Sequence, residues 1–326
     1  MIIKFLIFTF FILNTYAFTH FFNHWHCVGI NPCLDKPYKF KIGELPLVAW
    51  KKNDTILSTI NICRHLGSKL NKGSIKNGNL HCPYHNLKHD ESNNFGKIIM
   101  FEDKLWWSYN PIYPTPPNIP FYNKSGFKVQ HLEYIMNAGL KDCAYNSMDL
   151  HHPEFVHNNI FGFGSSIPPT NVKTIKLKDK VALYFDYHIK NQFFSKEKKD
   201  KISRNVNMFI SPNNALSKIT FDSNILIISV NMLPINICKT KWYISINHNF
   251  NTNNVVEMEI LKLSTKMILS QDSNQFDKME KDSSLKEEII FKKMLKYDKS
   301  IQYVKEILKD YKYPNLYLCT QFIKSI

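Results

Sequence analysis

The sequence predicts an α+β protein of two domains: an antiparallel β domain, followed by a domain with an antiparallel sheet and long helices. Three observations support this prediction. Short apolar runs separated by Lys, Asn, Asp and Gly turns fill the first third of the chain. A proline-rich stretch follows near residue 117. Beyond it come longer β-branched runs and then two stretches with helical periodicity.

The composition is that of a folded globular protein. The chain has 326 residues, of which 44% are hydrophobic, so it can build two cores and is not disordered throughout. The net charge of +15 comes mainly from dispersed Lys and lacks the basic motif of a nucleic-acid reader. We therefore expect no nucleic-acid partner, and a docking face for an acidic redox protein instead. Seven widely spaced cysteines, an odd number, argue against a small disulfide scaffold.

Residues 1–18 form an apolar segment that reads as a signal, targeting or anchor sequence. Its apolar run is short for a membrane span and suits a signal-peptide core ahead of Ala17. Ala17-Phe18 resembles the junction of a plastid-targeting sequence. The predicted location is therefore a plastid, or a membrane reached through this segment, and otherwise the cytoplasm. A buried N-terminal strand is the alternative.

The first domain is predicted at residues 19–117. Its strand-like runs are residues 45–50, 56–62, 98–101 and 105–109. Five prolines then form a stiff linker: Pro111, Pro114, Pro116, Pro117 and Pro120. We place the domain boundary there, which leaves residues 118–326 for the second domain.

The second domain mixes helices and strands. Helical spacing is expected in residues 140–157, and strands in residues 174–189, 219–231 and 242–250. A long amphipathic helix is predicted at residues 255–281, and a charged one at residues 286–309. The expected buried side of the long helix is Met258, Leu261, Leu263, Met267 and Ile268.

Two short motifs in the first domain each pair a Cys with a His. Cys63-Arg64-His65 is followed, after sixteen residues, by Cys82-Pro83-Tyr84-His85. A zinc finger usually keeps its two Cys in one motif and its two His in another. A Rieske [2Fe–2S] cluster instead binds one iron through two Cys and the other through two His. The mixed motifs favour the Rieske cluster, with structural zinc as the alternative.

A second set of polar residues lies in the segment from Asn146 to His157. Asp149 and His152 are three residues apart, so on a helix they would share a face. His157 follows beyond Pro153. Two His with one later carboxylate form the facial triad of non-haem Fe(II) oxygenases. Such a His pair can also be structural, but the upstream iron–sulfur motifs favour iron.

Together these motifs resemble those of the Rieske non-haem iron oxygenases, in their catalytic α subunits. The family includes aromatic-ring-hydroxylating and chlorophyllide- or pheophorbide-oxidising branches. The resemblance implies that Cys63, His65, Cys82 and His85 hold the [2Fe–2S] cluster. It implies a helix-grip, START-like catalytic domain with a mononuclear Fe(II). The implied iron ligands are His152, His157 and a late Asp, which is Asp272, or else Asp277.

The resemblance also implies partners and a reaction. The family is a head-to-tail homotrimer, in which the catalytic Asp149 would bridge His85 of one subunit to His152 of its neighbour. Electrons would come from a ferredoxin or a flavin reductase. With O2, the enzyme would hydroxylate, demethylate or desaturate an apolar molecule in a cavity lined by Phe161, Phe163, Phe185 and Tyr187. The alternative is a Rieske electron carrier without a working mononuclear iron site.

One departure from the family lies beside a cluster ligand. Asn86-Leu87 stands where the family usually has Gly-Trp. Asn tolerates the left-handed backbone conformation that Gly would supply, so we expect the turn to be kept. Loss of the Trp is expected to change the packing under the cluster or the docking face.

Overall fold

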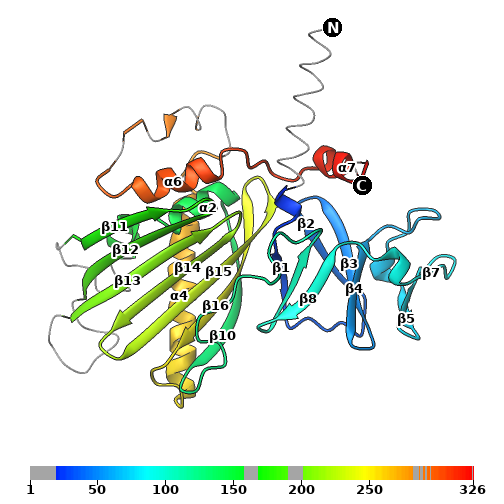
Figure 1. Cartoon of the computed structure of the whole chain (residues 1–326), viewed down its shortest axis with the longest axis horizontal. Coiled ribbons are helices and arrows are strands. Elements are labelled where there is room, and N and C mark those ends of the chain that lie inside the picture. The colour runs from blue at the N-terminus through cyan, green and yellow to red at the C-terminus, as the bar shows by residue number, and fades with distance from the viewer. Residues whose placement is uncertain are drawn as a thin grey trace, which may run out of the picture. The chain divides into compact units, whose positions relative to one another are not determined.

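The structure is a computed structural model. It describes residues 20–157, 168–189, 201–281, 295–324 and 326, and also residues 286, 289, 290, 292 and 293. The chain divides into two compact units, residues 1–117 with 310–326, and residues 118–309 (Figure 1). The apolar segment 1–18 lies outside the described residues. Within the described part, no helix is long and apolar enough to cross a membrane.

The first unit contains three three-stranded antiparallel sheets. The first sheet, in the order β1-β9-β8, consists of β1 (His26–Ile30), β9 (Lys104–Ser108) and β8 (Lys97–Phe101). The second consists of β2 (Tyr38–Ile42), β3 (Leu45–Lys52) and β4 (Thr55–Ile60). The third consists of β5 (Ser74–Lys76), β6 (Asn79–His81) and β7 (Lys88–His89). The four strands expected here correspond to β3, β4, β8 and β9.

The end of the chain belongs to this first unit, which differs from the expected second domain of residues 118–326. Helix α7 (Leu316–Lys324) buries Cys319 and Phe322. The Phe322 ring stacks on Phe22 with centroids 4.4 Å apart. The Glu44 N–H donates to the Pro314 carbonyl at 2.8 Å. Residues 310–326 therefore complete the core of the first unit, because the apolar side of α7 finds its partners there.

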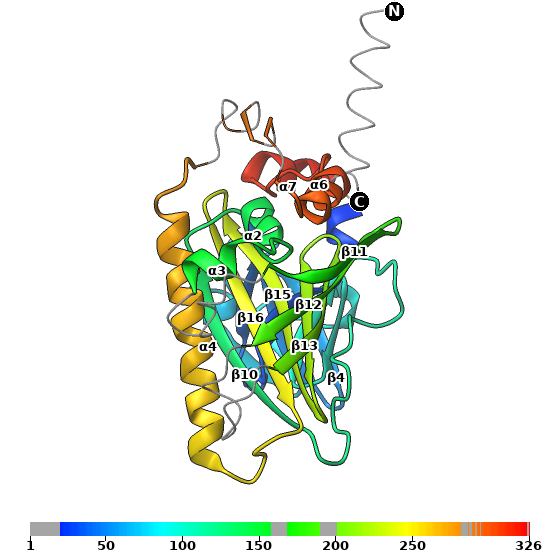
Figure 2. The ribbon, with the colours of Figure 1, turned by 90° about the vertical axis from the view of Figure 1, so that its left-hand side faces the viewer.

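The second unit is built on one seven-stranded antiparallel sheet, in the order β10-β16-β15-β14-β13-β12-β11 (Figure 1). Its strands are β10 (Lys128–Met136), β11 (Thr170–Lys176), β12 (Lys180–Ile189), β13 (Lys201–Ile210), β14 (Asn214–Phe221), β15 (Asn224–Asn236) and β16 (Lys239–His248). Its helices include α2 (Leu140–Asn146), α3 (His152–Val156), α4 (Val255–Phe276) and α6 (Lys299–Ile307). Figure 2 shows α4 running alongside the sheet, with α2 and α3 near its C-terminal end. The predicted α+β class is confirmed.

Several predicted elements of this unit have different limits. The runs at residues 174–189 and 219–231 are hairpins rather than single strands, since turns separate β11 from β12 and β14 from β15. The second turn contains Asp222 in the left-handed region, with φ of 53°. The helix expected over residues 140–157 is interrupted between α2 and α3. Within the described part of the stretch expected as a helix at residues 286–309, α6 covers only Lys299–Ile307.

The predicted buried side of α4 is only partly correct, since Met258, Leu261 and Ile268 are half-buried. Leu263 and Met267 are 56% and 58% exposed. The residues that are buried are Thr265, Leu269, Asp272, Ser273 and Phe276. They follow helical spacing, but three of the five are polar, so a search for apolar periodicity misses them. The position of Asp272 on this side carries its carboxylate into the interior of the second unit.

We expect Phe322→Ala to destabilise the first unit by about 3–5 kcal/mol, because it removes a buried ring stacked on Phe22. Four of the five Trp lie in this unit, so urea unfolding followed by Trp fluorescence reports on it. Leu316→Ala, on the 70% exposed side of the same helix, is the matched control and should change stability little. Equal effects of the two substitutions would contradict the assignment of α7 to this core.

Candidate metal centres

The two Cys-His motifs fold into matching loops. The Cys63 N–H donates to the Ser68 carbonyl at 2.8 Å, and the Gly67 N–H donates back to the Cys63 carbonyl at 2.9 Å. In the second loop the Cys82 N–H donates to Leu87 at 2.9 Å, and the Asn86 N–H donates to Cys82 at 3.1 Å. Gly67 and Asn86 hold equivalent positions with φ of 74° and 57°. Asn86 therefore supplies the left-handed turn that was expected of it.

The four side chains of these motifs divide into a buried pair and an exposed pair. The Cys63 and Cys82 thiols lie in an apolar cluster with Val48, Trp50, Leu57, Leu70 and Leu80. The His65 and His85 imidazoles are exposed, and their Nδ1 atoms lie 3.1 Å apart. Two buried sulfurs behind two converging surface imidazoles match the donor set of a Rieske cluster. The residues therefore fit a [2Fe–2S] cluster whose imidazole-bound iron faces the surface.

The surroundings of Cys82 favour its thiolate. Burial raises the pKa of Cys82, but hydrogen bonds from the backbone N–H groups of Tyr84 and His85, and from the Cys63 and Ser68 side chains, outweigh it. The pKa of Cys82 is thus below its usual value. Because the thiolate is the form that binds metal, the loop prepares this side chain for ligation.

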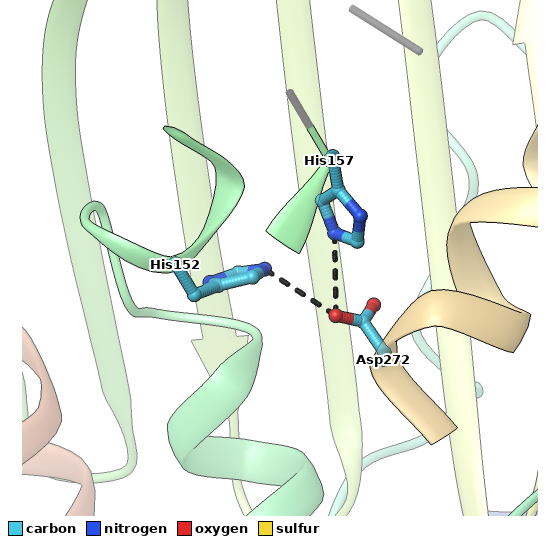
Figure 3. A group of neighbouring side chains, drawn as sticks. All are labelled: His152, His157 and Asp272. Carbon is cyan, nitrogen blue, oxygen red and sulfur yellow. Dashed lines mark ion pairs between the residues drawn. The ribbon is translucent and has the colours of Figure 1, made fainter. Parts of the chain in front are cut away.

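The second group consists of His152, His157 and Asp272 (Figure 3). His152 begins α3, His157 ends it, and Asp272 comes from α4. The Asp272 Oδ1 atom lies 3.2 Å from Nε2 of His157 and 3.7 Å from Nε2 of His152. One donor atom from each residue lies within 4.8 Å of the others. Two imidazoles and a carboxylate arranged in this way are the donor set of a non-haem iron site.

Both imidazoles are oriented by a hydrogen bond at Nδ1. His157 Nδ1 lies 2.9 Å from Oε1 of Gln271, and His152 Nδ1 lies 3.1 Å from the backbone carbonyl of Asp149. Both partners are acceptors, so Nδ1 of each ring donates a proton. The Nε2 atom of each ring faces Asp272, which at His157 it contacts as a hydrogen-bond donor, and loss of the Nε2 proton would leave the lone pair that a metal ligand requires. The Asn146 Nδ2 donates to Asp272 Oδ1 at 3.4 Å and fixes the carboxylate.

The charge of Asp272 acts differently on the two imidazoles. Burial lowers the pKa of His152, although the Asp272 and Asp149 carboxylates oppose this effect. Burial also lowers the pKa of His157, but its hydrogen bond to Asp272 and the charge of that carboxylate outweigh it, and the pKa is raised. The group therefore holds one imidazole in its neutral form, ready to ligate, and one paired with a carboxylate.

The structure places the two remaining predicted carboxylates differently. Asp149 lies in the connection before α3, so it does not share a helix face with His152. Its Oδ1 accepts from the His151 N–H at 2.8 Å, and its Oδ2 lies 3.8 Å from His152 Nδ1. Asp277 ends α4 and accepts from Asn137 Nδ2 at 3.2 Å. Of the two late Asp residues, it is Asp272 that lies beside the His pair.

A cavity of about 250 Å³ adjoins His152, His157 and Asp272. Phe185 and Tyr187 line it as expected, whereas Phe161 and Phe163 lie outside the described residues. Part of its wall comes from apolar side chains of β15 and β16 that the sequence did not single out: Leu226, Ile228, Val230, Trp242 and Ile244. The arrangement can hold an apolar molecule against the metal-binding group.

The comparisons with known proteins agree with the first of these centres. The family model for the Rieske [2Fe-2S] domain matches residues 24–103, which include both Cys-His motifs. The chain is 26% identical over 162 residues to the oxygenase component of dicamba O-demethylase from Stenotrophomonas maltophilia, covering 41% of this chain and 47% of the relative. It is 24% identical over 169 residues to chlorophyllide a oxygenase, chloroplastic, from Arabidopsis thaliana, covering 46% and 31%.

Solved structures share the fold over most of the chain. The structure of dicamba monooxygenase bound to 3,6-dichlorosalicylic acid superimposes with a TM-score of 0.74 at 16% identity, covering 88% of this chain and 96% of that one. Pseudomonas putida CBB5 NdmA gives a TM-score of 0.73 at 15% identity, covering 89% and 91%.

The chain thus contains a Rieske [2Fe–2S] domain. It is similar in sequence to oxygenase components of the Rieske type and shares their fold, so the resemblance drawn from its motifs is confirmed. The two sequence alignments span less than half the length of these relatives.

Gln271→Leu should weaken binding of ferrous iron at the His152, His157 and Asp272 group by roughly 10–100-fold, because His157 loses the acceptor that orients it. The measurement is a ferrous-iron titration under argon. Gln275→Leu, one turn further along α4 on its exposed side, is the matched control. Unchanged affinity in the Gln271 variant would show that this hydrogen bond does not orient the ligand.

Proposed function

We propose that the protein is a Rieske-type oxygenase that hydroxylates, demethylates or desaturates an apolar organic molecule with O2. The observation that carries the proposal is the buried group of His152, His157 and Asp272 beside an apolar cavity, in a chain that also carries the Rieske motifs. When bound, the cluster supplies single electrons and the mononuclear Fe(II) supplies activation of O2.

The residues of the first unit would bind and shield the cluster. Cys63 and Cys82 would hold it from inside an apolar cluster that excludes water. His65 and His85 would supply the two imidazole ligands, and both are exposed, so they offer the point where electrons would enter and leave. The donor would be a ferredoxin or a flavin reductase. Support comes from the relatives named as oxygenase components, a name that implies a separate electron-transfer protein.

The residues of the second unit would bind the iron and exclude water from it. His152, His157 and Asp272 would hold Fe(II) from one side and leave its other positions open towards the cavity. Gln271 and the Asp149 carbonyl keep both Nε2 atoms directed at the metal. The apolar wall holds the substrate over the iron and keeps bulk water out.

Asp149 would connect the two centres between subunits of a homotrimer. Its side chain is 28% exposed and lies 3.8 Å from His152 Nδ1, so one carboxylate can contact both an iron ligand and a neighbouring chain. The exposed His85 of a second copy is the partner that the family resemblance implies. A Rieske electron carrier without mononuclear iron is the weaker reading, since a carrier needs no assembled triad beside a cavity.

Anaerobic reconstitution should load roughly three irons and two sulfides per chain. Cys82→Ser should remove two irons and both sulfides, while His157→Ala should remove one iron and no sulfide. Iron and acid-labile sulfide analysis measures both losses. Zinc in place of iron, or absence of labile sulfide, would overturn the assignment. Substrate-dependent O2 uptake, tested against pigments, sterols and small aromatics, then tests the activity.

Asp149→Ala should leave both metal centres loaded and lower turnover by roughly tenfold or more, because the link between subunits is lost. Turnover with reduced donor is measured together with metal content. Glu154→Ala removes a nearby carboxylate of α3 and serves as the matched control. Full activity of the Asp149 variant would contradict the route between subunits.

A further inference from the structure

The cavity wall is not uniformly apolar, and its polar part is concentrated on two strands. Ser203, Asn205 and Asn207 alternate along the inner face of β13, and Ser217 lies on the same face of β14. The opposite part of the wall, on β15 and β16, is apolar. The cavity is therefore suited to a molecule with an apolar body and a polar group on one side.

Most of these polar side chains already have partners. Asn205 Nδ2 donates to Ser203 Oγ at 2.9 Å and to the Ser203 carbonyl at 3.1 Å. Thr265, on the α4 wall, donates to the Leu261 carbonyl at 2.9 Å. These groups are occupied within the fold, so they are not the ones available to a ligand.

Asn207 and Ser217 are different. They are directly opposite each other in the β13–β14 register, and both line the cavity. Neither side chain makes a hydrogen bond to any part of the chain that the structure describes. Both side chains are half-buried, so a bound molecule would cover them, and one that supplies a hydrogen-bond partner is favoured over one that covers them without doing so. An amide and a hydroxyl side by side can both donate and accept.

The position of this pair sets where the polar group of the ligand must be. Ser203 pairs with Tyr187, whose hydroxyl donates to the Leu150 carbonyl at 2.7 Å, so this end of β13 lies near the His152 loop. Asn207 is four residues further along the strand, or about 13 Å. A molecule that reaches from the metal ligands to this pair is therefore elongated.

The charge of the wall limits the ligand further. Among the described lining residues there is no Lys or Arg, and the carboxylates among them are Asp149 and Asp272, at the metal end. A carboxylate or sulfonate at the Asn207–Ser217 end of this cavity would therefore lack a Lys or Arg partner. An uncharged polar group is the kind that the Asn207–Ser217 pair can satisfy.

We infer that Asn207 and Ser217 form a specificity-determining pair that selects uncharged, elongated, mainly apolar substrates carrying a hydroxyl, carbonyl or carboxamide at the end remote from the iron. This inference rests on the proposed function, because it takes the cavity to be the substrate site. It adds to that function the chemical class of the substrate and the residues that recognise it.

Three probes with one apolar body test the inference on the full-length protein under argon: biphenyl, 4-phenylphenol and biphenyl-4-carboxylate. Binding is followed by isothermal titration of the unmodified chain. We expect 4-phenylphenol to bind about three- to tenfold more tightly than biphenyl, and the carboxylate to bind most weakly.

Asn207→Leu and Ser217→Ala should each remove the preference for 4-phenylphenol while leaving biphenyl affinity unchanged. Unchanged biphenyl affinity also shows that the cavity has folded. Ser229→Ala is the matched control, since Ser229 alternates with the lining residues of β15 and faces away from the cavity. It should keep the preference.

Three outcomes would each contradict the role of Asn207 and Ser217. They are equal binding of biphenyl and 4-phenylphenol by the unmodified protein, tighter binding of the carboxylate, and a preference for 4-phenylphenol that survives both substitutions. These measurements need neither turnover nor reduced cluster. If the proposed oxygenase function were wrong, the protein would lack iron or would not take up O2. That outcome is distinct from a failure of the Asn207–Ser217 inference, which would appear only in the binding preferences.

Discussion

The contact between Asp272 and His157 is the constraint on which the second unit depends. It joins α4 to the end of α3 across 3.2 Å, and both side chains are buried. A buried carboxylate is costly unless it is paired and hydrogen-bonded, so α4 must turn this face towards the His pair. The polar residues on the buried side of α4 then follow from the site rather than from core packing.

The antiparallel sheet supplies what the helices do not. Its inner face provides an apolar wall from β15 and β16 and a polar edge from β13 and β14. Because side chains alternate along a strand, one face can be shaped for a ligand while the other face packs or meets solvent. The proposed metal ligands come from helices and their ends, so residues of the cavity wall and of the metal-binding group can vary separately.

In the first unit, the two Cys-His loops place a pair of imidazoles at the surface and keep the two cysteine sulfurs buried. Two loops with matching backbone hydrogen bonds bury the thiols and leave the imidazoles outside. The left-handed residue closing each loop is Gly67 in one and Asn86 in the other. Asn86 shows that the turn depends on the conformation, which Asn can adopt, and not on glycine itself.

The sequence alone determined the α+β class and the strands around the Cys-His motifs, because these depend on local periodicity and on spacing within motifs. The family resemblance offered Asp272 or else Asp277 as the late carboxylate, and only the tertiary structure brings Asp272 beside the His pair. The sequence did not determine the role of Gln271, whose partner lies 114 residues away. It placed Leu263 and Met267 inside, although both are exposed, since apolar periodicity cannot register a helix whose buried side is polar. It also assigned residues 310–326 to the second domain. Only the tertiary structure shows that Phe322 stacks on Phe22, because the two residues lie at opposite ends of the sequence. Only the sheet register shows that Asn207 and Ser217 are opposite each other, because local periodicity does not fix which residues of two strands pair.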